Sequence, residues 1–219
     1  MFRKIIFISA FIAFIGQGVK SQSLRFGVFA NPVISWMKTD ISKIEGDGTV
    51  IGVNFGLMAD KYFAEHYAFS TGLSLHNMGG VLWYKDGKLL RTSEGIDTVQ
   101  PGKRIRYNLQ YIHVPFALKF KTNEIGYITY FAQLGLDPMV NVRTRATVKD
   151  QGISSVNASK EINPFYMAYH LSAGIEYKLL GNTAVVAGLT YMNGFTDVTD
   201  DTSQKAVMHN VELRIGVIF

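Results

Sequence analysis

Apolar and polar residues alternate through the last thirteen positions of the chain, Val207–Phe219. One face is mostly aliphatic and ends on the aromatic Phe219, while the other face includes Glu212 and Arg214. An alternating strand with an aromatic end is typical of the closing strand of a membrane β-barrel, whose apolar face meets lipid and whose polar face points inward. Phe219 is therefore our candidate signal for the barrel assembly machinery.

The same alternation recurs upstream and predicts seven further strands. These strands are Leu24–Trp36, Val50–Tyr62, Tyr67–Met78, Arg104–Phe120, Tyr127–Arg143, Phe165–Leu179 and Thr183–Phe195. In the strand over Arg104–Phe120 the apolar positions change parity between Tyr111 and Ile112, so we place a β-bulge there that keeps both halves facing outward. Because Pro32 has no N–H for the strand ladder, we expect a bulge or a frayed end in the first strand.

The connections between these strands alternate in length. Three short links lie near Glu65, Asn123 and Gly181. Four long links span Met37–Thr49, Gly79–Lys103, Thr144–Pro164 and Thr196–Ala206. Bacterial barrels alternate short periplasmic turns with long extracellular loops, so this rhythm predicts an all-β, eight-stranded, antiparallel up-and-down transmembrane barrel with both termini in the periplasm. Asp86-Gly87 is a hairpin signal in the second long link, where we expect the flanking strands to extend outward as a ribbon.

The first 21 residues have the pattern of a secretory signal peptide, which leaves residues 22–219 as the barrel domain. Arg3 and Lys4 precede an uncharged stretch and a small-x-small site that ends at Ser21. Removing this segment takes away three basic residues and no acidic one, so the formal charge falls from +5 to +2 and gives no signal for a nucleic-acid partner. The chain has no cysteine, which excludes a disulfide framework and a lipoprotein anchor.

Three stretches resemble the small outer-membrane barrels of Bacteroidota-type bacteria known as the PorT family. They are Tyr62–Leu73, Gln110–Lys119 and Gly174–Tyr177. The resemblance implies an eight-stranded barrel in the cell outer membrane, in a family whose best-known member assists type IX secretion, the export route tied to gliding. It supplies no catalytic or cofactor-binding residues. Asp97-Thr98-Val99 also resembles the Asp-Thr-aliphatic sequence used for O-glycosylation in these bacteria, which makes Thr98 a candidate acceptor in an exposed loop.

Charged residues recur on the predicted inward face. They are Arg25, Asp60, Lys119, Asp137, Arg143, Glu176, Lys178, Glu212 and Arg214. An eight-stranded barrel has room inside only for side chains, so we favour an interior filled by paired charges over a conductance path. The predicted central cluster consists of Arg25, Lys119, Glu176, Glu212 and Arg214.

Signals for catalysis or metal binding are weak. His76, His113 and His170 fall on the inward face with serines nearby in sequence, but no Gly-x-Ser-x-Gly elbow is present. Asp197, Asp200 and Asp201 share one predicted loop, and their spacing does not match a calcium loop. We therefore predict a non-enzymatic protein without a metal or another cofactor.

The pattern as a whole favours an integral outer-membrane barrel, surrounded by lipid, that serves as a docking or accessory protein of the envelope. Secretion or motility proteins are the candidate partners. Two alternatives stay open: a narrow porin-like or solute-binding barrel, sensitive to changes at Glu212 or Arg214, and adhesion through the long link Gly79–Lys103.

Overall fold

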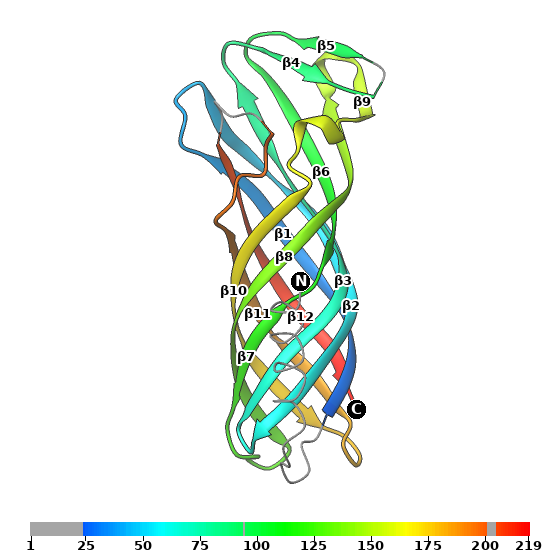
Figure 1. The fold of residues 1–219 in the computed structure, drawn as a ribbon, viewed down its shortest axis with the longest axis vertical. Helices are drawn as coiled ribbons and strands as arrows, with labels where there is room; N and C mark the ends of the chain where they lie inside the picture. The colour runs from blue at the N-terminus through cyan, green and yellow to red at the C-terminus, as the bar shows by residue number, and fades with distance from the viewer. Residues whose placement is uncertain (1–23, 94, 201–204) are drawn as a thin grey trace, which may run out of the picture.

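A closed ring of antiparallel strands forms the wall of the molecule in the computed structural model, which describes residues 24–93, 95–200 and 205–219 (Figure 1). The predicted signal peptide lies outside these residues. The strands of the ring are β1 (Leu24–Thr39), β2 (Ile44–Ala64), β3 (Tyr67–Tyr84), β6 (Lys103–His113), β7 (Phe116–Lys121), β8 (Ile128–Val148), β10 (Phe165–Lys178), β11 (Ala184–Gly194) and β12 (Ala206–Ile218). Because β6 and β7 both pair with β3 and β8, they share one position in the ring. β12 pairs with β1, and this pairing closes the predicted eight-stranded barrel.

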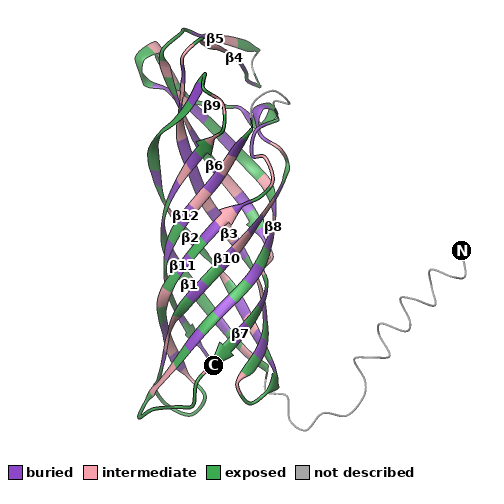
Figure 2. Cartoon of the chain, turned by 90° about the vertical axis from the view of Figure 1, so that its left-hand side faces the viewer, coloured by how far each residue is buried: buried purple, intermediate pink, exposed green. Residues whose placement is uncertain are grey.

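Successive residues of each strand point alternately outward and inward, as the alternation predicts (Figure 2). The outward side chains form an apolar band, in which Ile51, Leu57 and Leu189 are 73%, 59% and 60% exposed. Such a surface is unfavourable in water and suits contact with lipid. Closure of the ring gives the backbone groups of the wall partners that lipid cannot supply. Among the described residues, no helix is long and apolar enough to cross a membrane.

The prediction that the strand over Arg104–Phe120 reverses its faces at Tyr111 is wrong. Odd-numbered positions point inward along both β6 and β7, from Ile105 and Tyr107, each with 0% exposure, to Lys119 with 1%. The apolar residues of β6 from Ile105 to Tyr111 are therefore interior residues. Polarity changes side here because this part of β6 stands beyond the apolar band, where the outside of the barrel meets water and the inside is a packed core.

A bulge does occur at this level, but on the neighbouring strand. Gln110 pairs with Arg143 while the next residue, Tyr111, pairs with Asn141, so Val142 is the extra residue of β8. The bulge changes the parity of β8, and Arg143 consequently lies exposed on the outer surface instead of pointing inward as predicted.

Pro32 causes neither the bulge nor the frayed end that we expected. The pairing of β1 with β2 runs through Pro32 without a change of register. On the other side the ladder with β12 is interrupted between Phe29 and Val33 and resumes in the same register. The side-chain oxygen of Asn31 accepts a hydrogen bond from the N–H of Ile215 at 3.0 Å, which holds the two strands together beside the proline.

The two ends of the barrel differ. At the basal end, adjacent strands are joined through residues 65–66, 122–127 and 179–183. The opposite end carries a two-stranded sheet of β4 (Lys88–Arg91) and β5 (Ile96–Val99), the strand β9 (Ile153–Asn157), and the 3-10 helices η2 (Lys149–Gln151) and η3 (Ser159–Glu161). We call the described residues within 85–102, 149–164 and 195–200 the head. Long connections mark the extracellular side of bacterial barrels, so we expect the head to be extracellular.

Three of the four predicted long links are shorter than expected because the strands continue into them, whereas the link predicted over Thr196–Ala206 keeps its length. Only residues 40–43 join β1 to β2, in place of Met37–Thr49. β3 and β6 extend outward as the expected ribbon, whose last pair is Tyr84 with Lys103. Asp86-Gly87 does not form a hairpin between paired strands, because β4 pairs with β5 and not with β3. The Asp86-Gly87 signal indicates where the chain turns after β3, but it does not specify which strand pairs with β4.

Candidate functional site

An ion-pair cluster fills the basal part of the barrel interior. We define the basal charge cluster as Arg25, Asp60, Lys119, Lys121 and Glu176. The ammonium group of Lys119 lies 2.5 Å from Oδ2 of Asp60 and 2.6 Å from Oε1 of Glu176. Arg25 and Lys121 approach Oε2 of Glu176 at 3.0 and 2.7 Å. A lysine that is only 1% exposed needs such partners, because an isolated charge is costly away from water.

A histidine and aspartate network occupies the middle of the interior. Asp137, with 0% exposure, lies 2.8 Å from Nε2 of His113 and 2.7 Å from Nδ1 of His170. The hydroxyl of Ser74 lies 3.0 Å from the other ring nitrogen of His113. Ser74, His113 and Asp137 thus have the connectivity of a nucleophile, a base and an orienting acid. The cavity beside them has a volume of about 60 Å³, far below the roughly 300 Å³ or more of a typical ligand pocket.

Glu212 forms a second part of this central network. Its carboxylate accepts hydrogen bonds from the amides of Asn54 at 2.7 Å and Asn31 at 3.2 Å, and Nδ1 of His76 lies 3.7 Å away. The rings of His76 and His113 are 4.2 Å apart between centroids, which joins the two parts of the network. These partners satisfy a buried carboxylate with amide groups instead of a cation.

The structure brings together three of the five residues of the predicted central cluster. Arg25, Lys119 and Glu176 meet in the basal charge cluster, whereas Glu212 lies in the central network. Arg214 donates to the side-chain oxygen of Gln133 at 2.5 Å. Lys178, also predicted inward, lies at the basal rim with 47% of its side chain exposed and pairs with Glu124.

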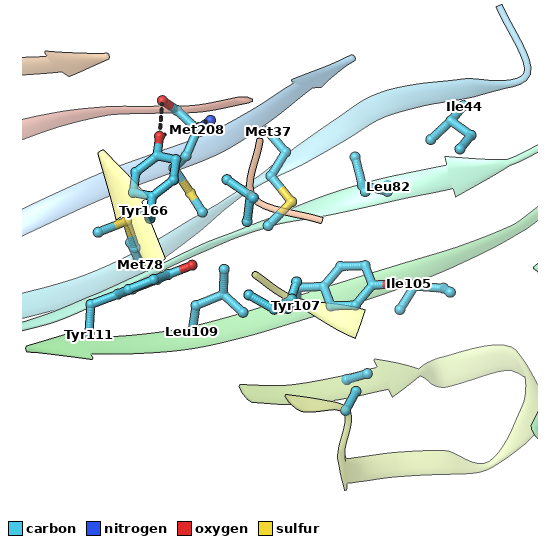
Figure 3. Close-up of a cluster of buried hydrophobic side chains, with 14 of the residues drawn as sticks. Met37, Ile44, Met78, Leu82, Ile105, Tyr107, Leu109, Tyr111, Tyr166 and Met208 are labelled. Carbon is cyan, nitrogen blue, oxygen red and sulfur yellow. Dashed lines mark hydrogen bonds between the residues drawn. The ribbon is translucent and has the colours of Figure 1, made fainter. Parts of the chain in front are cut away.

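A packed apolar core closes the interior above the polar networks (Figure 3). Its large side chains include Met37, Met78, Tyr84, Tyr107, Tyr111, Met139, Tyr166 and Met208. The hydroxyl of Tyr166 donates to the carbonyl oxygen of Met208 at 3.2 Å. A Cβ atom at Gly194 would lie 1.6 Å from this hydroxyl, so only glycine leaves room for the ring. This upper core was missed from sequence because its β6 residues were assigned to the outer surface.

The upper core continues into the head. Leu90 and Val99 point inward from β4 and β5 with 0% and 1% exposure. Glu161 of η3 is 2% exposed and lies 2.5 Å from the ammonium group of Lys88 and 3.0 Å from Nε of Arg91. The hydrogen bond to Glu161 raises the pKa of Arg91, which keeps the guanidinium charged. Apolar packing therefore ties the head to the barrel, and the buried carboxylate of Glu161 holds η3 to the β4–β5 sheet within the head.

The outer face of the β4–β5 sheet is apolar at its centre. Leu89 and Ile96 are 61% and 68% exposed, although they are aliphatic. Thr98 is exposed on the same face, because it pairs directly with Leu89. Thr98 lies in a strand and not in the loop that the sequence suggested.

The acidic residues of the last long link serve the local backbone. Oδ1 of Asp197 accepts hydrogen bonds from the N–H groups of Thr199 at 3.0 Å and Ala206 at 2.9 Å. Asp200 lies 3.5 Å from Arg91, and Asp201 falls outside the described residues. Within the described part of the chain, no group of three His, Asp or Glu side chains is placed to hold a metal ion.

An apolar outer band, a closed strand ring and an interior filled with side chains define an integral membrane barrel of the outer-membrane type. The sequence matches the family model of the outer membrane protein beta-barrel domain over residues 19–200, and the chain belongs to this family. The protein accordingly resides in the outer membrane, with lipid around its band.

Comparison with solved structures finds small outer-membrane proteins. Neisserial surface protein A is 16% identical, covers 88% of this chain and 95% of its own, and has a TM-score of 0.49. The attachment invasion locus protein Ail of Yersinia pestis is 15% identical; the match covers 91% of this chain and 100% of Ail, with a TM-score of 0.42. OprG of Pseudomonas aeruginosa is 10% identical; the match covers 90% of this chain and 97% of OprG, with a TM-score of 0.47. No curated protein matches the sequence.

Proposed function

We propose that this protein is a non-enzymatic docking protein of the outer membrane, which uses a filled barrel to present a rigid extracellular head to an envelope protein. The observation that carries the proposal is the continuity of the upper core with the head through Leu90 and Val99. The ion pairs of Glu161 hold the parts of the head to one another. A head that is ordered before binding loses less entropy on association than a flexible loop does.

The docking face that we propose is the outer side of the β4–β5 sheet. Exposed Leu89 and Ile96 supply the apolar centre that binding surfaces commonly have, and Arg91 lies beside them as a polar edge. The partner that fits is a protein with a small apolar patch. A role in type IX secretion or gliding, which the family resemblance implies, stays a prediction about which partner this is.

The interior favours docking over transport. The upper core and the basal charge cluster leave a cavity of about 60 Å³ at the level of the central network. We therefore expect no steady ion current in a planar bilayer, and no change of current in Glu212→Gln or Arg214→Gln. A reproducible conductance that these substitutions alter would favour the narrow-pore alternative.

The same small cavity supports a non-enzymatic role. Ser74 is 4% exposed and His113 is 5% exposed, so a substrate has no room to reach the hydroxyl without opening the barrel. Incubation with an activated serine-directed phosphonate, followed by intact-mass measurement, is expected to leave the protein unmodified. A single adduct at Ser74 would contradict this conclusion.

The experiment that tests docking is crosslinking in the native membrane followed by mild-detergent purification and mass spectrometry. Leu89→Ser combined with Ile96→Ser should lose the captured partner. The matched control is Leu180→Ser combined with Ile125→Ser, which removes two residues of 85% and 65% exposure from the basal end and should retain it. Equal capture by both double variants would refute the proposed face.

Adhesion is the second candidate, because the same exposed face could contact a surface outside the cell. A shortened variant discriminates the two: residues 85–102 are replaced by Asn-Gly, which the pairing of Tyr84 with Lys103 allows to close as a hairpin. Loss of cell attachment with unchanged capture of envelope proteins favours adhesion, and the reverse result favours docking.

A further inference from the structure

Three arginines lie on the outer wall just beyond the apolar band, on a different part of the surface from the β4–β5 sheet. Arg106 of β6 pairs with Thr147 of β8, and Arg143 and Arg145 follow on the same face of β8. Arg143 and Arg145 are exposed, and Arg106 is partly exposed. Within the described part of the chain, none of the three forms an ion pair with a carboxylate; Arg145 donates to Ser155 at 2.8 Å and Arg106 to Asn108 at 3.4 Å.

A groove of about 300 Å³ lies against two of these arginines. Arg143 and Arg145 line one side, Asn108 and Gln110 of β6 lie in the middle, and the backbone of Gly52 borders the other side. The amide of Gln110 is oriented by a hydrogen bond to the side-chain oxygen of Asn77 at 2.9 Å. No acidic residue lines the groove, so its fixed charge is positive.

The groove opens directly onto the lipid-facing band. Ile51, which lines it, is 73% exposed, and Val140 and Val142 of β8 are 49% and 48% exposed beside Arg143. An anionic group held by the arginines would therefore have apolar wall immediately below it. Arginine stems also cover apolar surface while their guanidinium groups stay in the polar layer.

We propose that this arginine groove binds the phosphate-bearing headgroup of an outer-leaflet lipid. Guanidinium groups bind phosphate through paired N–H donors, and the neighbouring amides of Asn108 and Gln110 can donate to sugar or phosphate oxygens. The acyl chains of the same molecule lie along Ile51 and Val142. Such a lipid fixes the depth and rotation of the barrel and so the direction in which the head points.

The test is a titration of the detergent-solubilised protein with fluorescently labelled, bis-phosphorylated lipid A, read by anisotropy. The variant replaces Arg106, Arg143 and Arg145 together by Gln. Because each basic residue at a membrane surface strengthens binding to anionic lipid several-fold, the triple variant should bind roughly 100-fold more weakly. The matched control removes three charges elsewhere by combining Lys61→Gln, Lys160→Gln and Lys205→Gln. Its affinity for lipid A should lie within about twofold of that of the parent chain.

Two further arms identify the ligand. Dephosphorylated lipid A should bind the parent chain no better than it binds the triple variant, and millimolar inorganic phosphate should not displace the lipid. Three results would each overturn the proposal. The triple variant could bind lipid A as tightly as the parent chain does, the parent chain could bind dephosphorylated lipid A as tightly as the phosphorylated form, or inorganic phosphate alone could displace the lipid. Heat-modifiable gel migration shows whether each variant is folded. If the triple variant does not fold, the same titration is made with the single variants Arg143→Gln and Arg145→Gln.

Discussion

Replacing Lys119 by Met is expected to destabilise the barrel strongly, because it removes the cation shared by two buried carboxylates. Lys119 is 1% exposed and holds Asp60 at 2.5 Å and Glu176 at 2.6 Å. Methionine keeps most of the side-chain volume, so the loss is mainly electrostatic. Breaking a buried ion pair by removing one partner costs about 3–5 kcal/mol.

The matched control is Lys178→Met at the basal rim. Lys178 pairs with Glu124 at 2.9 Å, but the two side chains are 47% and 41% exposed. Exposed pairs contribute about 0–1 kcal/mol, so this variant should unfold almost as the parent chain does. Both substitutions make the same chemical change, and only the burial of the partners differs.

The assay is reversible urea unfolding in lipid vesicles, followed by tryptophan fluorescence and by heat-modifiable gel migration. Lys119→Met should lower the free energy of unfolding by at least about 3 kcal/mol. Adding Asp60→Asn should restore part of this loss, because it removes one uncompensated carboxylate. Equal free energies of unfolding for Lys119→Met and Lys178→Met would contradict this account of the basal charge cluster. A further loss of stability when Asp60→Asn is added to Lys119→Met would contradict it as well.

Three further predictions concern assembly, the head and its modification. Phe219→Ala should reduce the fraction of heat-modifiable protein in cells while the purified folded barrel keeps its stability, because the backbone bonds of Phe219 to Phe26 remain. Burial raises the pKa of Tyr84, so the stability of the upper core, to which Tyr84 belongs, should fall as pH rises past about 10, where the unfolded tyrosine ionises first; tyrosinate absorbance and limited proteolysis follow this. An O-glycan on Thr98 would cover Leu89, its partner across the sheet, so docking through this face requires that the native protein show no intact-mass difference that Thr98→Ala abolishes.

Alternation was sufficient to predict the barrel because most of the wall separates two constant environments. From Leu24 to Ile34 in β1, for example, each even position faces lipid and each odd position faces the interior, so residue type reports direction. The same rule failed from Ile105 to Tyr111. Those residues are apolar because they are inside a core, and sequence alone does not state at which residue the surrounding medium changes from lipid to water.

The candidate site was predictable residue by residue but not as a set of contacts. Parity placed Arg25, Lys119 and Glu176 inward, yet their meeting depends on the stagger of three strands that are distant in sequence. The contact of His113 with Asp137 depends on register in the same way, since it joins the end of β6 to β8. Strand register is a property of the closed ring and is not encoded in the local pattern.

The change of polarity along β6 also explains how one strand ring can serve two purposes. Within the band, apolar residues such as Ile112 point outward and polar residues such as His113 fill the interior. Beyond it, Arg106 points outward while Tyr107 is buried, so the strand behaves as part of a water-soluble sandwich. Because the ladder between β3 and β6 continues through both regions as far as Tyr84 and Lys103, the base on which the head packs is continuous with the membrane segment. Force or orientation imposed on the head is consequently transmitted to the barrel, which is the mechanical property that a docking protein needs and a pore does not.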